Sequence, residues 1–426
     1  MGPRAMAMGG AHTAIAEGPV ASYYNPGALG QVISNPSGFE LQTSGRFEIN
    51  GEVIEGANDF YEVANQCRRE APAAVCNNVE LSKAALKLRN PGGEGALAEA
   101  VGGLNLKFGR LAFFSNTFAF RGVTPDVDSG ASLTVASLPN NRTNLRVRGA
   151  SYYEFGVGYG HEILETGLFL GTNVKGIVGR TGFTDLPLTR ENPELGAVIR
   201  NYDRSTNVSF MPGVDVGLLW DARESFPDVW GRPRVGFVGR NVNAPAFNQP
   251  ARARELHDRY RYYNLQGQSR MGVALDPHRR WTVAVDFDIT QNLTMVERHT
   301  SRLYAAGTEL RLVDDPTFAI PLRGGVSKNI AQGNSGTLWT MGFGLHFMHF
   351  FMDFAAAIPE RWHRVQSIGG VERLPHQFGL SAQLALLFGG TESIAEPNRD
   401  PFSTAPARTP KASSSTAPLN RDPFRR

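Results

Sequence analysis

Hydrophobic and polar residues alternate along many segments of the chain. In residues 281–289, one set of alternate positions holds Trp281, Val283, Val285, Phe287 and Ile289, and the other holds Thr282, Ala284, Asp286 and Asp288. Side chains of a β-strand point alternately to the two faces of a sheet, so this pattern predicts a strand with one apolar face. The same alternation recurs in residues 153–160, 208–220, 339–346 and 378–388. We therefore expect an all-β fold.

Counting every such run predicts about fourteen strands. Their expected spans are 38–48, 101–108, 111–121, 148–161, 166–178, 207–221, 233–242, 265–275, 279–289, 302–312, 317–327, 337–346, 349–357 and 376–388. Most are near the ~9–11 residues of a tilted membrane strand. Long links, such as 49–100 and 179–206, alternate with short ones, such as 109–110 and 347–348, and the link between 221 and 233 is the intermediate exception. Outer-membrane barrels combine short periplasmic turns with longer outer loops. The sequence thus predicts a closed transmembrane antiparallel β-barrel over residues 38–388.

Composition narrows the class of protein. Charged residues are 19% of the 426 positions, against a usual ~25%. No uninterrupted apolar run approaches the ~18 residues of a membrane helix, which leaves a closed sheet as the way to pair every backbone group in hydrocarbon. A soluble sandwich or propeller is the alternative. A sandwich gives no reason for the alternating loop lengths, and the sequence lacks the repeat of ~40–50 residues that a propeller would show. The net charge of +3 is too small to argue for a nucleic-acid partner.

The face opposite the apolar one is rich in glycine and small polar residues. It also carries charged residues that we expect to face the lumen: Asp215, Asp286, Asp288, Glu309, Arg311 and Arg323. Such a carboxylate could line a pore or be a structural partner of Arg311 or Arg323, and the structural role is favoured. Trp220 and Trp281 fall near shorter links, where an aromatic girdle is expected.

The longest link, 49–100, is expected to be a partly helical extracellular cap, with helices over 57–70 and 82–88. Cys67 and Cys76 lie around the gap between these helices. One local disulfide in an oxidising compartment is favoured over two free thiols, and a metal site is not expected because no histidine lies nearby.

Residues 389–426 are rich in Pro, Ala, Ser, Thr and Arg and are predicted to be a disordered periplasmic tail. The sequence Asn-Arg-Asp-Pro-Phe occurs at 398–402 and again at 420–424. The repeat is either drift or a short linear motif in which Phe402 and Phe424 anchor a periplasmic protein.

The first thirty residues contain thirteen Gly or Ala and have little bulk to form a core of their own. The stretch Gly2-Pro-Arg-Ala-Met-Ala-Met-Gly-Gly-Ala11, followed by Asn25-Pro-Gly-Ala-Leu29, resembles the mature start of the FadL-like superfamily of outer-membrane barrels. It looks closest to the TraF-like conjugal-transfer branch and is also similar to PorV-like barrels of type 9 secretion. Members typically read Gly-x-Arg-Ala-x-Gly-Met-Gly-Gly-Ala and Asn-Pro-Ala-Gly-Leu, so this chain departs at Ala7 and at Gly27-Ala28. The resemblance implies a 14-stranded barrel in which residues 1–37 fold inside the lumen as a plug, or hatch.

Five residues of this segment have a physical role in such a plug. Gly9, Gly10 and Gly27 would allow close approach to the barrel wall, and Asn25-Pro26 would fix a turn. They either shape the plug alone or also touch a ligand. No signal peptide is visible after Met1, and we expect that a leader has been removed from the mature protein. The last strand, ending at Leu386-Leu387-Phe388, also resembles the aromatic-ended assembly signal of such barrels.

The resemblance implies a location in the outer membrane of a Gram-negative (diderm) bacterium, in contact with outer-membrane lipid. It further implies a passive channel that takes small hydrophobic molecules through a plugged lumen. The alternative is an outer-membrane scaffold, or a component of a secretion or conjugation system, that holds partner proteins through its long loops and tail.

An enzyme is not expected, and neither is a cofactor or a metal. Histidines occur at 161, 346, 349, 363 and 376, with His346 and His349 on either side of a predicted turn, but no catalytic order or metal-like spacing joins them. The glycine-rich stretches lie inside strands and give no phosphate-binding loop.

Overall fold

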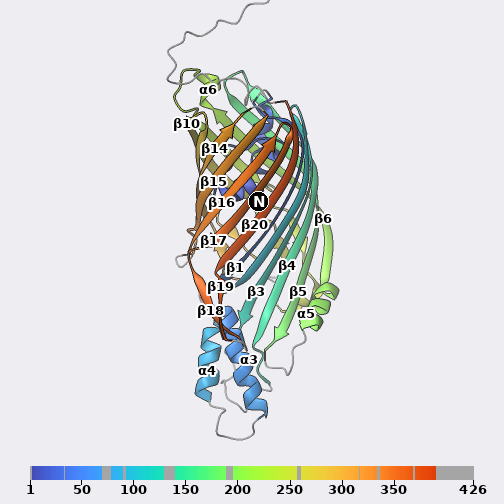
Figure 1. Ribbon diagram of the computed structural model, residues 1–426. Coiled ribbons are helices and arrows are strands. Elements are labelled where there is room, and N and C mark those ends of the chain that lie inside the picture. Colours follow the sequence, from blue (N-terminus) through green and yellow to red (C-terminus); the bar gives the residue numbers. More distant parts are fainter. Residues whose placement is uncertain are drawn as a thin grey trace, which may run out of the picture.

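The body of the protein is a closed barrel of fourteen antiparallel strands (Figure 1). The computed structural model describes residues 2–32, 34–69, 78–89, 93–128, 140–188, 195–256, 261–315, 317–332, 336–367 and 370–389. In order around the barrel the strands are β1 (Ser37–Asn50), β2 (Gly95–Phe108), β3 (Leu111–Asp126), β4 (Asn144–Ile163), β5 (Leu168–Pro187), β6 (Thr206–Asp221), β7 (Arg234–Arg240), β10 (Gln268–His278), β11 (Trp281–Asp288), β14 (Leu303–Asp314), β15 (Phe318–Asn329), β16 (Thr337–Phe347), β17 (Phe350–Pro359) and β20 (Gln377–Phe388). β20 returns to β1, with Ser37 opposite Phe388, and closes the sheet. The predicted fold is confirmed.

The two ends of the barrel differ. One end carries turns as short as Gly109-Arg110 and the intermediate link, which holds the short helix α6 (Ala222–Ser225). The other end carries the long links, with helices α3 (Val53–Arg69), α4 (Asn78–Lys87), α5 (Leu195–Arg204) and α7 (Ala251–Leu256). It also carries three small hairpins that the sequence pattern did not predict: β8 (Ala246–Asn248) with β9 (Tyr262–Asn264), β12 (Asn292–Leu293) with β13 (Thr300–Ser301), and β18 (Trp362–Ser367) with β19 (Gly370–Pro375). We call these the short-turn end and the long-loop end.

The helices α3 and α4 stand beyond the barrel at the long-loop end (Figure 1). They form a hairpin around a small core, in which Phe60, Ala64, Leu81 and Leu88 are buried together with Leu188, just after β5. None of the described helices is long and apolar enough to cross a membrane.

The outer face of the wall is apolar and open to its surroundings. Alternate residues of each strand point outward, and on β16 and β20 these include Trp339, Met341, Leu380 and Leu384, each 43–57% exposed. Trp281 lies at a short turn and is 44% exposed, while Trp220 is half-buried on the outer face of β6. Pairing between neighbouring strands satisfies the backbone groups behind this apolar surface, as hydrocarbon requires.

The N-terminal segment lies inside the barrel. We refer to residues 2–32 as the plug; it contains α1 (Pro3–Ala7), α2 (Ala21–Tyr24) and the 3-10 turn η1 (Pro26–Gly30). Proline at the first helical position suits both α1 and η1, because it fixes φ where the missing N–H has no helical partner. Nearly every plug residue is buried. Small side chains let a segment without its own core fill a narrow lumen.

Candidate functional site

The turn at Asn25 fixes the plug to the wall. Its side chain, fully buried, donates from Nδ2 to the Thr13 carbonyl at 3.0 Å and to the Leu218 carbonyl of β6 at 2.9 Å, and Oδ1 accepts from the Gly27 N–H at 3.0 Å. One amide therefore joins two parts of the plug and the barrel, while Pro26 starts η1. A Cβ on Gly27 would lie 3.0 Å from the Leu219 nitrogen, so the close approach expected of this glycine is present.

The Gly9-Gly10 pair seats the plug against the opposite wall. Gly9 has φ +71° and Gly10 has φ +106°, in the left-handed region that favours glycine. A Cβ at Gly9 would lie 2.3 Å from the carbonyl oxygen of Val326 on β15. Within the structure these five motif residues shape the plug and hold it against the wall.

Buried ion pairs connect the plug to three strands. Arg4 of α1 donates from Nε to Glu309 Oε2 at 2.8 Å, and Arg323 donates from Nε to the same oxygen at 2.7 Å. Arg323 also donates to Asp353 Oδ1 at 2.5 Å, which His346 Nε2 contacts at 3.1 Å. We call Arg4, Glu309, Arg323, Asp353 and His346 the ion cluster. Because Glu309, Arg323 and Asp353 are each at most 6% exposed, their charges depend on one another for compensation.

The other predicted lumen residues also lie on the inner side of the wall. Asp286 receives the backbone N–H groups of His12 and Thr13 at 3.0 Å each and the Thr13 hydroxyl at 2.7 Å. Asp288 pairs with Arg270 at 2.6 Å. Asp286 therefore holds the plug against the wall, and Asp288 pairs with another residue of the wall.

Arg311 and Asp215 complete the predicted set. The Arg311 side chain is 31% exposed and lies 3.8 Å from Glu309, at the edge of the ion cluster. Asp215 is buried and contacts the Lys175 ammonium at 3.0 Å. Burial, with the positive charge of Arg4 adding to it, lowers the pKa of His12 in the plug well below its usual value.

An aromatic cavity of about 70 Å³ adjoins the plug at Tyr23. Phe118 stacks on Tyr23 with ring centroids 5.6 Å apart, and Phe120 stacks on Phe118 at 6.4 Å. Tyr152, 1% exposed, packs against Phe120 with the two rings tilted by 55°. The Arg240 guanidinium lies over the Tyr23 ring at 4.3 Å. We call this space the aromatic cavity; Glu154, Lys175, Asn241, Leu265 and Gln268 complete its lining.

Residues at the end of β7 form the polar side of this cavity. β7 is only seven residues long and stops at Arg240, while β6 continues past it. Asn243 takes over as the partner of β6: its Oδ1 accepts from Val214 N at 3.1 Å, and its Nδ2 donates to the Pro212 carbonyl at 2.8 Å. These backbone groups of β6 therefore remain hydrogen-bonded beyond the end of β7, and Arg240 and Asn241 are free to line the cavity.

The sequence interpretation missed the aromatic cavity. It assigned the glycine-rich positions of residues 153–160 to the lumen, and Tyr152 occupies the same face one position before that run. An aromatic residue on an otherwise small-residue face was the available signal. It also missed Arg4 and Asp353, which nothing in the alternation pattern separates from surface charges.

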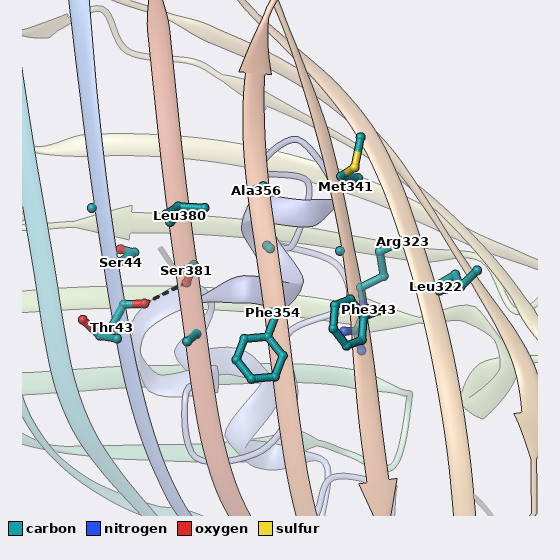
Figure 2. Close-up of a pocket in the computed structure, with 14 residues that line it drawn as sticks. Thr43, Ser44, Leu322, Arg323, Met341, Phe343, Phe354, Ala356, Leu380 and Ser381 are labelled. Carbon is teal, nitrogen blue, oxygen red and sulfur yellow. Dashed lines mark hydrogen bonds between the residues drawn. The ribbon is translucent and has the colours of Figure 1, made fainter.

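A separate hollow lies on the outer face of the wall, over β15, β16, β17, β20 and β1. It measures about 810 Å³, and its lining includes Met341, Phe343, Phe354 and Leu380 around the small residues Ala356 and Ala382. Figure 2 shows these side chains on the near side of the sheet and the plug behind it. The hydroxyl of Ser381, which is 6% exposed, donates to the Thr43 carbonyl at 2.9 Å and is thereby satisfied.

The expected disulfide, the repeated tail motif and the predicted disordered tail itself involve residues that the structure does not describe. Cys67 is buried in α3, but Cys76 lies outside the described residues, so the disulfide stays a prediction. Phe402 and Phe424 lie outside them as well, with the rest of the tail from residue 390. Over the described ranges, no group of three or more His, Cys, Asp or Glu could hold a metal ion.

Solved barrels with low sequence identity resemble this structure. A mutant of TodX described as a monoaromatic hydrocarbon channel is 12% identical, with a TM-score of 0.50, and the match covers 91% of this chain and 99% of that one. The toluene transporter TbuX of Ralstonia pickettii is 14% identical, with a TM-score of 0.49 and coverage of 91% and 98%. A FadL homologue of Pseudomonas aeruginosa is 11% identical, with a TM-score of 0.47 and coverage of 92% and 98%. The first match shows a shared fold.

No curated protein sequence matches this chain. The family model described as "F plasmid transfer operon, TraF, protein" matches residues 62–288, which is more than half of the chain. Those residues run from α3 through β11 and so include most of the aromatic cavity. This match shows that the chain belongs to the TraF family of the F plasmid transfer operon.

Proposed function

We propose that the protein spans the outer membrane of a diderm bacterium and admits small hydrophobic molecules through its plugged lumen. The wall supports a membrane location, because soluble proteins rarely expose contiguous apolar patches beyond a few hundred Å². Short turns of such barrels face the periplasm, so α3 and α4 would lie outside the cell. Lipid acyl chains would fill the outer hollow beside Met341 and Phe354.

The aromatic cavity is the observation that carries the transport proposal. It lies within the barrel and against the plug, so a molecule bound there would be held at the barrier to passage. Ring faces of Phe118, Phe120 and Tyr152 offer apolar contact without a reactive group. The plug closes the path beyond, and its displacement would release the molecule.

Binding of toluene to the purified full chain in detergent tests this function. Phe118→Ala removes a ring from the cavity and is expected to weaken binding. Phe113→Ala is the matched control, since Phe113 lies on the same strand but is 42% exposed on the outer face. Absence of toluene binding to the unaltered protein, or equal loss in both variants, would refute the proposal.

Membrane location is tested separately. We expect the protein to fractionate with outer membranes and to migrate differently on a denaturing gel before and after boiling. A single unshifted band from a soluble fraction would contradict a membrane barrel.

A second candidate function is a conjugation component, which the family match and the α3–α4 hairpin favour. The hairpin exposes Val79 and Leu86 at 54% and 56%, one above the other on α4. In a host that lacks the native protein, Leu86→Asp should then lower plasmid transfer frequency. Leu164→Asp, at an 87% exposed position of the short-turn end, is the control. Unchanged transfer with Leu86→Asp would remove this candidate.

A further inference from the structure

The aromatic cavity contains polar atoms that the protein itself leaves without partners. The Tyr152 hydroxyl is buried and has no hydrogen-bond partner among the described residues, and the same holds for the Asn241 side-chain oxygen. Both residues are at least nine-tenths buried, at 1% and 7% exposure. Leaving a buried polar group unpaired is costly, so few remain in native proteins without a reason.

Arg240 supplies further donors at the same place, beyond the hydrogen bond that its side chain makes to Tyr23. Its guanidinium lies over the Tyr23 ring, and no carboxylate of the described residues is within ion-pair distance of it. Asp215 acts on it electrostatically, but Asp215 is already paired with Lys175 at 3.0 Å. A guanidinium carries five N–H donors, and stacking on a ring leaves its edge available for hydrogen bonds.

The three charged residues that line the cavity, taken together with Asp215 beside them, balance in charge. Lys175 contacts Glu154 at 2.9 Å and Asp215 at 3.0 Å, so these two carboxylates share one ammonium. Arg240 brings the second positive charge, which makes two positive and two negative groups. An uncharged ligand preserves that balance, whereas an anion would leave one negative charge in excess in a poorly hydrated space.

We propose that the aromatic cavity binds a single uncharged aromatic ring that carries a hydroxyl group, a ligand of the phenol class. The hydroxyl can accept from Arg240 and donate to the Asn241 oxygen, and the Tyr152 hydroxyl can serve either role. The rings of Phe118, Phe120 and Tyr152 contact the apolar part. This inference rests on the proposed function and narrows its substrate class.

The cavity volume limits the ligand to one ring. At about 70 Å³ it is smaller than the ~150 Å³ apolar cavity that holds benzene in an engineered protein. A single ring would therefore enter only with movement of a neighbouring side chain such as Leu265, and a long acyl chain would not fit.

Phenol and toluene test the inference, because they differ by a hydroxyl in place of a methyl group. Affinities are measured by calorimetry on the purified full chain in detergent. A net hydrogen bond of about 1.4 kcal/mol corresponds to tenfold in affinity, so phenol should bind at least about tenfold more tightly than toluene. Benzoate, an anion of similar size, should bind more weakly than phenol.

Two variants locate the effect. Tyr152→Phe keeps the ring and removes the hydroxyl, and it should reduce the phenol-to-toluene affinity ratio by about three- to tenfold. Arg240→Met should bring the ratio close to one. Tyr153→Phe is the matched control: Tyr153 is the next residue but lies on the outer face, 46% exposed, where its hydroxyl accepts from Ser115. It should leave the ratio unchanged.

The outcomes separate the two proposals. Equal binding of phenol and toluene would overturn the phenol-class assignment and leave the hydrophobic channel standing. Tighter binding of benzoate than phenol, or an unchanged ratio in both Tyr152→Phe and Arg240→Met, would also overturn it. If neither ring binds, the transport function itself fails.

Discussion

Replacement of Arg4 by glutamine tests whether the ion cluster holds the plug in place. Arg4 is the plug member of the cluster and donates to Glu309 of β14 at 2.8 Å, whereas Glu309, Arg323 and Asp353 all lie on the wall and stay paired with one another when the plug leaves. A hydrogen bond to a charged group contributes about 1.5–3 kcal/mol. At about 1.4 kcal/mol per factor of ten, the equilibrium between seated and released plug should shift toward release by roughly one to two powers of ten.

Hydrogen–deuterium exchange of peptides from residues 2–32 measures this shift, since local opening governs exchange of buried amides. The matched control is Arg180→Gln. Arg180 pairs with Asp203 at 3.7 Å, but the two side chains are 50% and 63% exposed. Exposed pairs contribute about 0–1 kcal/mol, so plug exchange should stay as in the unaltered protein.

A double variant makes the reasoning sharper. Arg4→Gln with Glu309→Gln removes one charge of each sign from the plug–wall contact and leaves Arg323 with Asp353 at 2.5 Å. Its effect on plug exchange should be smaller than the sum of the two single effects, with a coupling of about 0.5–3 kcal/mol. Plug exchange that is the same in Arg4→Gln and Arg180→Gln would refute the role given to the ion cluster.

Three further predictions concern the plug and the wall. Gly9→Ala should prevent full seating of the plug and raise hydrogen exchange of the plug, because the added Cβ would lie 2.3 Å from the Val326 carbonyl oxygen of the wall. Gly109→Ala is the control, since this glycine also has a positive φ, +58°, but has open space around it, so only the backbone strain of the substitution should remain. Met341→Arg on the apolar outer face should lower the free energy of unfolding in bilayers by about 2–4 kcal/mol, whereas Val79→Arg on α4 should change it little, and urea titration in lipid vesicles compares the two variants. In a released plug His12 takes up a proton near pH ~6.5, whereas in the seated plug it stays neutral because its pKa is lowered. Seating is therefore favoured above that pH, and hydrogen exchange of the plug should rise as the pH falls below it. His12→Gln should flatten this pH dependence of plug exchange.

The alternation of side chains was enough to predict the barrel. Residues such as Val283 and Val285 point outward because the opposite face carries Asp286 and Asp288, and a shift of one residue would exchange the two faces. Strand ends at the long-loop side were harder to predict. β2 begins at Gly95, earlier than expected, because pairing of Ile49 with Ala96 extends the strand although its own residues give no clear period.

The functional residues could be predicted only in part. Charged residues on the inner face were found because a charge interrupts an otherwise small-residue pattern. Their partners were not, because Arg4 and Glu309 are 305 positions apart and only the seated plug brings them together. The aromatic cavity depends in the same way on Tyr23 of the plug meeting Phe118 of β3.

The length of β4 has a consequence for where selection takes place. Its 20 residues rise about 3.3 Å each, or about 66 Å along the strand, and a tilt of ~40° leaves about 50 Å along the barrel axis, twice the ~25 Å apolar band of such proteins. The exposed apolar side chains of β4 run from Tyr153 to Tyr159, next to the short-turn end. In the proposed membrane location the remainder of the strand would extend beyond the lipid, so solutes would be sieved by size at some distance from the bilayer surface.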